Sequence, residues 1–473
     1  MDSMNDPGAC AQPVAQGRLD GFRLGFYSCL TARADALFEL CDAVLCSPGR
    51  VTDLARLSLA DAHRRGHGAL YDGLNAGGID TDRLGELVAG IGVPRIAGPD
   101  GRMRVVLAVD VSNWLRPDAA TSSDRSFCHT YARGRGAAQM IPGWKYSFVA
   151  ALTAGASSWT ALLDAARLDP GDDETAATAD QLRLVVGRLR AAGYWAPGDP
   201  DILVVMDSGY DGVRLAWLLA DLPVTLVVRL RSDRVFHAPA GRRAGPTKGR
   251  PPRHGARLVL ADQATWPTPD VTTTSDTARY GTARTVAFAR MHQRLSARGG
   301  WATHAGELPI IESTLIRLQV DHLPGDRTPD PVWLWASQPA ATSDDVDHYW
   351  AMFLRRFDLE HTFRMLKQTL GWTRPLLRDP QAADRWTWLV LIAHTQLRLA
   401  RPLAADHRLP WQRPLPADRL TPARVRADFP RIHRTTTRPA SAPKPSRPGP
   451  GRPPGRKNRR RAAIPPVGKT TTG

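Results

Sequence analysis

Three acidic residues, Asp110, Asp207 and Glu360, are the best candidates for chemistry in this chain. Hard divalent cations such as Mg²⁺ and Mn²⁺ prefer carboxylate oxygens as ligands. Two such ions about 3.5 to 4 Å apart activate an attacking oxygen and stabilise the leaving one in phosphodiester displacement. If the fold brings the three carboxylates together, the sequence therefore predicts metal-assisted cleavage of nucleic acid, with two ions bound.

Glu360 lies in a helical pattern that also contains Arg356 and Lys367. At about 100° per residue, these three side chains fall within roughly 40° of arc and share one stripe. Ser343 is a suitable N-cap and Gly371 a suitable C-terminal stop, so one continuous helix is expected between them. An apolar stripe beside Glu360 should bury the helix on one face: Trp350, Phe353, Leu354, Phe357, Leu366 and Leu370.

A plain ion pair is the alternative reading of this helix. Arg356 and Glu360 are four residues apart, and an exposed pair at that spacing contributes only about 0.3 to 0.5 kcal/mol. Such a pair needs no function. The functional interpretation depends on the two aspartates converging on the same helix.

Asp110 and Asp207 each follow an unbroken apolar run, at 105–109 and 202–206. Such runs are typical of strands buried on both faces, and open α/β sheets place their sites at the carboxyl ends of those strands. A single aspartate there often only caps the next helix, as Asp211 is expected to do for the helix beginning at Gly212. Two such strands together favour a shared site.

The Glu360 region resembles the signature of the DDE transposases of bacterial insertion sequences, Tyr-x-x-Arg-x-x-x-Glu-x-x-x-x-x-x-Lys. Arg356, Glu360 and Lys367 match it position by position, and Phe353 holds the place of the tyrosine, keeping the ring without the hydroxyl. The segments 127–131 and 141–148 also look similar to transposase sequences. The resemblance covers roughly residues 20–400.

This resemblance implies an RNase H-like fold, an α/β mixed sheet flanked by helices. It implies that Asp110, Asp207 and Glu360 are catalytic metal ligands for Mg²⁺ or Mn²⁺, and that Lys367, Arg356 and Phe353 contact DNA. The implied activity is cleavage at transposon inverted-repeat ends followed by strand transfer into target DNA, with a homodimer acting on paired ends.

Five segments are expected along the chain. They are a helical N-terminal domain at 1–98, the first part of the RNase H-like core at 99–232, a β-rich insertion at 233–340, the second part of the core at 341–402, and a basic, largely disordered tail at 403–473.

The N-terminal segment has helical periodicity at 31–45, 51–64 and 81–90. The turn at 47–49 gives the first two helices a helix-turn-helix character. Recognition of DNA ends or dimerisation is one hypothesis for this segment, and plain packing against the core is the equally weighted alternative.

The insertion shows strand-like runs at 257–261, 282–289, 311–320 and 332–336. Arg250 lies in a Lys-Gly-Arg-Pro-Pro loop that we expect to follow the DNA backbone. In the resembling family a tryptophan of the insertion can hold an extruded base. Buried core positions are the expectation for each candidate here: Trp301, Trp333 and Trp335.

Lys and Arg number 63 against 46 Asp and Glu, which gives a net charge of +17 and favours a phosphate-bearing partner. Twelve of these basic residues, and no acidic one, fall between Arg431 and Gly473, so the folded part is only mildly basic. Arg452 and Arg456 in the tail are candidates for a narrow minor groove. A non-specific basic arm is an equally good explanation.

Several classes of function lack support. No motif for binding a nucleotide cofactor or zinc is present, and no apolar run approaches the roughly 20 residues that cross a bilayer. Five unpaired cysteines suit a cytoplasmic location. Besides a transposase, two alternatives stay open: a transposase-derived DNA-binding protein that no longer cuts, and an RNase H-like nuclease without joining activity.

Overall fold

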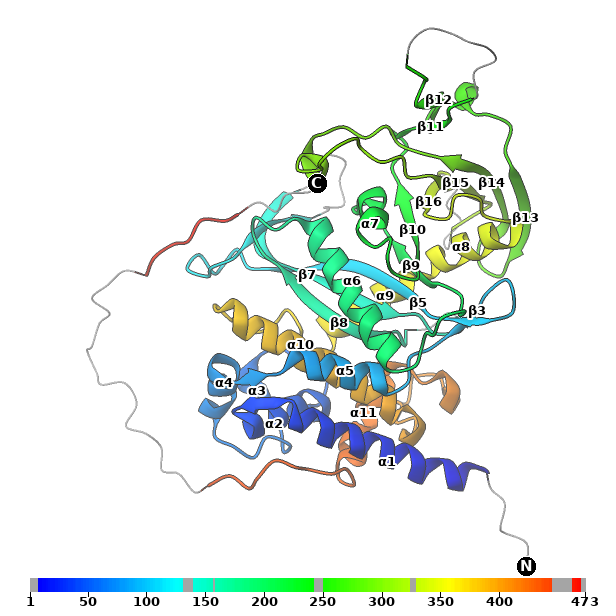
Figure 1. Cartoon of the computed structure of the whole chain (residues 1–473). Coiled ribbons are helices and arrows are strands. Elements are labelled where there is room, and N and C mark those ends of the chain that lie inside the picture. Colours follow the sequence, from blue (N-terminus) through cyan, green and yellow to red (C-terminus); the bar gives the residue numbers. More distant parts are fainter. Residues whose placement is uncertain are drawn as a thin grey trace, which may run out of the picture.

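The computed structural model describes residues 7–130, 139–155, 158–241, 250–323, 329–444 and 462–468, with side chains from residue 12 onward. Within these ranges the chain forms a mixed ten-stranded sheet with helices on both faces and a helical layer on one side (Figure 1). Among the described helices, none combines the length and the apolar character that a membrane crossing requires.

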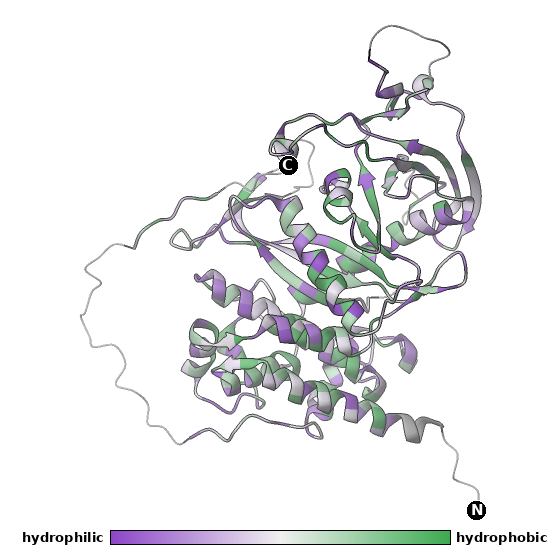
Figure 2. Ribbon diagram, viewed as in Figure 1, coloured by the Kyte–Doolittle hydropathy of each residue, from purple (hydrophilic) through white to green (hydrophobic). Residues whose placement is uncertain are grey.

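The central sheet has the strand order β13-β14-β15-β16-β10-β9-β5-β7-β6, and β8 pairs separately with β7. Its apolar central strands form the middle of the hydrophobic core (Figure 2). The strands are β5 (Val106–Leu115), β6 (Ser126–Thr130), β7 (Gln139–Ala151), β8 (Ala161–Leu168), β9 (Ile202–Met206), β10 (Val224–Leu230), β13 (Val271–Thr277), β14 (Gly281–Met291), β15 (Ser313–Val320) and β16 (Val332–Ala336).

The faces of the sheet are covered by different helices. Side chains alternate between the two faces along a strand, and β7 shows both sides: Phe148 packs on Phe363 of α9 with ring centroids 5.2 Å apart. Lys145, on the opposite face, bonds Glu174 at the start of α6 at 2.8 Å. The helices concerned are α6 (Glu174–Ala191), α7 (Gly212–Leu218), α8 (Ser343–Arg355) and α9 (Phe357–Gln368).

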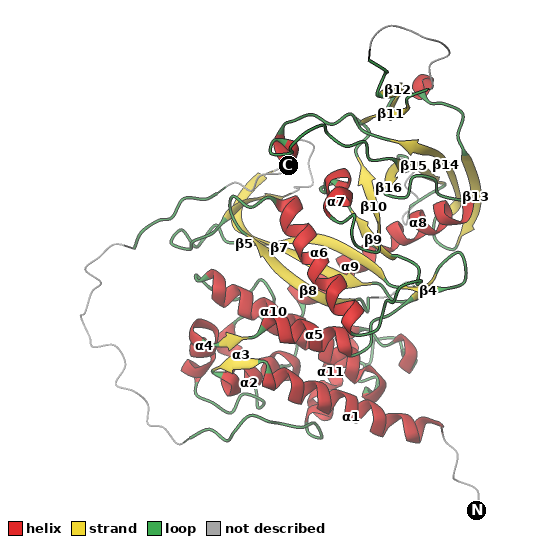
Figure 3. Cartoon of the chain, in the orientation of Figure 1, coloured by secondary structure: helices red, strands yellow, loops and turns green. Residues whose placement is uncertain are grey.

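Helices from both ends of the chain form one layer, seen on one side of the sheet in Figure 3. They are α1 (Pro7–Ser28), α2 (Ala34–Cys46), α3 (Leu54–Leu57), α4 (His67–Ala76), α5 (Thr81–Gly90), α10 (Pro380–Ala400) and α11 (Pro422–His433). The smaller elements are β1 (Leu30–Ala32) with β2 (Gly78–Ile79), β3 (Ile96–Ala97) with β4 (Met103–Arg104), β11 (Val235–Pro239) with β12 (His254–Val259), η1 (Gln263–Thr265), η2 (Gly299–Trp301), η3 (Arg401–Leu403) and η4 (Ala417–Arg419).

A buried polar cluster holds this helical layer together. Arg23 of α1 is fully buried and donates two hydrogen bonds to Asp42 of α2, at 2.7 and 2.9 Å. It also bonds Gln396 of α10 at 2.7 Å, and His433 of α11 lies 3.1 Å from Asp42. Burial alone would raise the pKa of Asp42, but Arg23 and His433 hold it below its ordinary value. Four helices therefore depend on one charged contact.

The β-rich insertion is part of the core sheet rather than a separate β-domain. Strand β16 pairs with β10 in the register Val227↔Ala336 to Leu230↔Trp333, and β15, β14 and β13 continue from it. Only β11 and β12 within 233–340 form a sheet of their own in the described residues. Four strands of the β-rich segment expected at 233–340 thus extend the core sheet.

The tail also differs from the expectation of a largely disordered segment. Within 403–444 the chain forms α11, whose buried Val425 and Phe429 pack in a helix that contacts α2 and α10. Residues 462–468 return to the sheet, where Gly468 exchanges backbone hydrogen bonds with Arg125 and Phe127 at 2.8 and 3.1 Å. The basic stretch at 445–461 lies outside the described residues.

The helix-turn-helix interpretation of the N-terminal segment is not supported. The second helix was expected over 51–64, but the structure has only the four-residue α3 there, followed by turns. Val51 instead donates a backbone hydrogen bond of 3.0 Å to Thr369 and ties this segment to the end of α9.

We predict that Arg23→Ala destabilises the full chain by about 3 to 5 kcal/mol, because it leaves the buried carboxylate of Asp42 without its main partner. The midpoint of urea denaturation measures the change. Arg33→Ala is the matched control, since Arg33 pairs with Asp72 on the surface. A midpoint that falls no further for Arg23→Ala than for Arg33→Ala would contradict this view of the cluster.

Candidate active site

Asp110 and Asp207 lie at equivalent positions on neighbouring parallel strands. Strands β5 and β9 pair as far as Val109↔Met206, and the next residue of each is the aspartate. The predicted convergence of the two strands is thus observed. Asp110 does not end its strand, however, because β5 continues to Leu115 against β7 alone.

Glu360 is carried by a pair of helices rather than one. The chain was expected to be helical without a break, but α8 ends and α9 begins at Arg356. The N–H of Arg356 bonds the carbonyl of Phe353 at 3.0 Å, a tight 3₁₀-type step. The cap of α8 is Thr342, in a capping box with Asp345, and not the expected Ser343.

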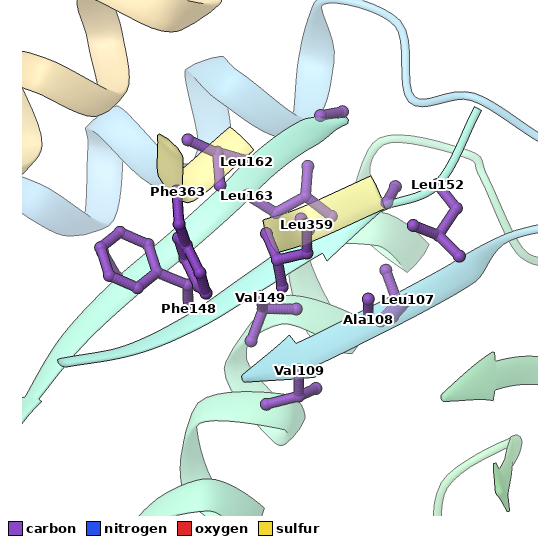
Figure 4. Close-up of a cluster of buried hydrophobic side chains, with 14 of the residues drawn as sticks. Leu107, Ala108, Val109, Phe148, Val149, Leu152, Leu162, Leu163, Leu359 and Phe363 are labelled. Atoms are coloured by element: carbon purple, nitrogen blue, oxygen red, sulfur yellow. The ribbon is translucent and has the colours of Figure 1, made fainter. Parts of the chain in front are cut away.

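Apolar contacts fix α9 against the sheet. Figure 4 shows Leu359 and Phe363 over side chains of β5, β7 and β8. Leu359 is fully buried and Phe363 nearly so. Phe357, which was expected in the same apolar stripe, is 56% exposed. The buried stripe therefore determines which side of α9 faces the sheet.

Asp110 and α9 lie on the same face of the sheet. The cross-strand partner of Asp110 is Phe148, and directly opposed residues of paired strands point to one face. Since Phe148 contacts Phe363 of α9, the carboxylate of Asp110 is directed toward the helix that carries Glu360.

The guanidinium of Arg356 lies among all three predicted carboxylates. Its Nη1 donates a hydrogen bond of 2.5 Å to Oδ2 of Asp110 and lies 3.8 Å from Oε1 of Glu360. Its Nη2 lies 3.5 Å from Oδ2 of Asp207. Two strands and one helix, far apart in sequence, thus direct their acidic groups at a single cation.

Burial within this cluster changes the ionisation of Asp110. Burial raises the pKa of Asp110 to about 6, and the neighbouring Glu360 and Asp207 add to the rise, while Arg356 and the N–H of Val111 oppose it. A carboxylate in this setting is stabilised by added positive charge. The electrostatics of the site therefore favour a cation.

Lys367 lies about two turns after Glu360 on α9. Its ammonium group is 5.6 Å from the centre of the Trp372 ring. Burial lowers the pKa of Lys367, against the opposing effect of Glu360 and Asp110. The predicted alignment of Glu360 and Lys367 on one stripe is consistent with this shared electrostatic environment.

A cleft of about 580 Å³ reaches Asp110 and Asp207 from the α6 side of the sheet. Lys145, His129 and Arg231 contribute basic or ionisable groups to its lining. The carboxylates thus stand between this cleft and the helix α9. Glu174 and Asp211 also line this cleft, so its charge is mixed rather than uniformly basic.

Two further residues near the carboxylates were missed in the sequence. Arg229 of β10 lies 3.6 Å from Asp207. The parallel strands β9 and β10 pair as far as Met206↔Val228, and Asp207 and Arg229 are the next residues of the two strands. A lone arginine inside an apolar strand was the available signal. Tyr210 has a buried hydroxyl without a hydrogen-bond partner among the described residues, and burial followed by Asp110 raises its pKa well above the usual value.

The remaining predicted DNA-binding residues lie elsewhere. Phe353 is only 8% exposed and packs in the core, so its ring is not available to DNA in this structure, which corrects that expectation. Arg250 is exposed and ion-paired with Glu307 beside β12. Arg452 and Arg456 lie outside the described residues. All three candidate tryptophans of the insertion are buried, as expected for core residues: Trp301, Trp333 and Trp335.

The donor set fits a hard divalent cation. Asp110, Asp207 and Glu360 offer only carboxylate oxygens, which suit Mg²⁺ or Mn²⁺. In the part of the chain that the structure describes, no three acidic, histidine or cysteine side chains are already spaced to hold a metal ion. Arg356 lies where the three carboxylates converge, so binding of a cation requires its guanidinium to withdraw.

Comparison with known proteins identifies the family of this chain. A family model described as DDE superfamily endonuclease matches residues 25–294, more than half of the chain. The match includes Asp110 and Asp207 and ends before Glu360. No curated protein matches the chain significantly.

We predict that Arg356→Ala makes thermal stability depend on divalent cations. Without Arg356 the three carboxylates repel one another, so the melting temperature in EDTA should fall by several degrees, at about 2 to 4 °C per kcal/mol. Added Mg²⁺ should raise the melting temperature of the Arg356→Ala variant by more than it raises the melting temperature of the parent chain. Differential scanning fluorimetry with and without Mg²⁺ measures both effects.

Arg355→Ala is the control, because Arg355 pairs with Asp358 and contacts none of the three carboxylates. Equal Mg²⁺ responses of the Arg355 and Arg356 variants would exclude a shared cation site at these carboxylates.

Proposed function

The chain belongs to the DDE superfamily endonuclease family, and we propose that it is a DNA transposase. In this proposal it cuts the ends of a mobile DNA element and joins the freed 3′-hydroxyls to target DNA. The reaction class is phosphodiester hydrolysis followed by transesterification at the same carboxylates.

One observation carries the proposal: Asp110, Asp207 and Glu360 all lie within 4 Å of the guanidinium of Arg356. A structural ion pair needs one carboxylate per arginine. Three carboxylates face Arg356, and Arg229 adds a second guanidinium 3.6 Å from Asp207, so the negative groups outnumber these two guanidinium groups and suit a bound cation.

Asp110, Asp207 and Glu360 are the residues that would hold the metal, Mg²⁺ or Mn²⁺ and in this class commonly two ions. Bound there, divalent cations activate the attacking oxygen and stabilise the leaving oxygen. The rigid pairing of β5 with β9 fixes two of the ligands, and the packed stripe of α9 fixes the third.

The basic groups around the carboxylates bind and orient the DNA strand. Lys367 is placed for a scissile or neighbouring phosphate, and Arg356, once it leaves the carboxylates, has a bidentate donor group free for the phosphate as well. Arg231 lines the cleft and Arg229 lies beside Asp207, and both suit the approaching backbone, while Lys145 of the cleft lining is paired with Glu174. Joining two ends at one target suggests that two copies of the chain act together.

The proposal is tested by incubating the full chain with Mn²⁺ and duplexes carrying the inverted repeats that flank its gene. We expect nicked and joined products. Asp110→Asn should reduce both on the order of a thousandfold or more, the scale seen when a group stabilising the transition state is removed. Binding of the duplex should persist, because the substitution removes negative charge.

Asp80→Asn is the matched control, since Asp80 caps α5 and asparagine caps helices equally well. Cleavage products that survive Asp110→Asn would refute the assignment of the site. Cleavage without any joined product would reduce the proposal to a nuclease on the same fold.

A further inference from the structure

A small cavity away from the carboxylates is lined by three arginines and no acidic residue. It has a volume of about 200 Å³ and lies where α1, α10 and η3 meet two loops. Its basic residues are Arg18 of α1, Arg398 of α10 and Arg401 of η3. In the described residues none of the three has an ion pair with a carboxylate, whereas the buried Arg23 and Arg188 elsewhere in the fold do.

Among the described residues the contacts of these arginines are to neutral groups, and Arg401 also donates a hydrogen bond to the backbone carbonyl of Asp418. Arg18 donates to the carbonyl of Ile91 at 2.7 Å, and Arg398 approaches the carbonyl of Gly92 at 3.4 Å. Arg401 lies over the ring of Trp159, 5.4 Å from its centre. The guanidinium groups are thus fixed around the cavity while their charges stay uncompensated.

Two further observations indicate a site for an anion. The hydroxyl of Thr153, which also lines the cavity, is buried and has no hydrogen-bond partner among the described residues. Burial lowers the pKa of Arg398 to about 10, with Arg18 acting in the same direction against Tyr194. A bound anion would relieve both the repulsion and the unpaired hydroxyl.

The size of the cavity restricts the anion. Sites for drug-sized ligands are typically about 300 to 1,000 Å³, so this smaller cavity suits a single charged group. Arginine forks match the geometry of phosphate oxygens. Arg18 is exposed at the rim, so a phosphate can enter while still attached to a longer chain.

We propose that this cavity holds a backbone phosphate of the DNA on which the chain acts, as a second anchoring point outside the catalytic carboxylates. The assignment to DNA rests on the proposed function. The loop that carries Thr153 also accepts hydrogen bonds from Arg355, at 2.7 Å from the carbonyl of Thr153 and 2.5 Å from that of Gly155. The loop that lines the cavity is therefore hydrogen-bonded to Arg355, the residue that precedes Arg356 in the chain.

The test measures binding of the full chain to a random-sequence duplex of about 40 base pairs by fluorescence anisotropy over a range of salt, with Ca²⁺ replacing Mg²⁺. Arg18→Glu changes an exposed side chain and should leave folding intact. It should weaken binding about tenfold and reduce the slope of log affinity against log salt by about one, the value for one lost phosphate contact. Arg398→Gln should act in the same direction.

Arg56→Glu is the matched control: it makes the same charge change on an exposed arginine of the same helical layer that does not line the cavity. It should alter affinity less than about twofold. If Arg18→Glu and Arg398→Gln bind the duplex no differently from Arg56→Glu, the proposal is overturned.

A second arm separates DNA from a free anion. If pyrophosphate raises the melting temperature of the parent chain but not of the Arg398→Gln variant, while duplex binding is unchanged by both cavity substitutions, the site takes a small anion and the assignment to DNA is wrong. If the cavity substitutions weaken DNA binding but the parent chain does not cut DNA, the proposed catalysis is wrong and the proposal for the cavity still holds.

Discussion

The arrangement of this molecule depends on one electrostatic constraint, the gathering of three carboxylates around the guanidinium of Arg356. Without a nearby positive charge, the carboxylates of Asp110, Asp207 and Glu360 would repel one another in a partly buried environment. Burial and these like charges together raise the pKa of Asp110. The guanidinium of Arg356 offsets this repulsion because it lies within 4 Å of all three carboxylates. In the proposed function Arg356 fills this role in the absence of a metal and withdraws when a cation binds the three carboxylates.

Neutral packing makes that constraint possible. The two aspartates owe their proximity to the parallel pairing of β5 and β9, and the third carboxylate owes its position to the apolar side of α9. Behind this face, α10 connects the sheet to helices from the N-terminus through the cluster around Arg23 and Asp42. The same α10 supplies Arg398 to the cavity lined by three arginines. A single layer of helices thus supports the face that carries the candidate active site and also supplies residues of the arginine-lined cavity.

Local patterns in the sequence were sufficient for the two strands that lead to Asp110 and Asp207, whose proximity the structure shows. Uninterrupted apolar runs identified β5 and β9, and the cap at Asp211 was confirmed by its bond to the N–H of Arg214. Features that depend on tertiary contact were missed. The break at Arg356 preserves helical spacing, so periodicity cannot detect it. Strand patterns do not specify partners, so the sequence did not show that the strands of the insertion continue the core sheet. The helix α11 was overlooked because a proline-rich, basic composition concealed its short apolar stripe.

The central claim is that the three carboxylates bind a common metal site from which Arg356 withdraws. A crystal structure of the full chain soaked with Mn²⁺, with manganese located by its anomalous scattering, tests it most directly. The account predicts anomalous density in contact with oxygens of Asp110, Asp207 and Glu360, at roughly the 2.0 to 2.6 Å typical of hard cations. Manganese bound elsewhere, with Arg356 still bonded to Asp110, would contradict it.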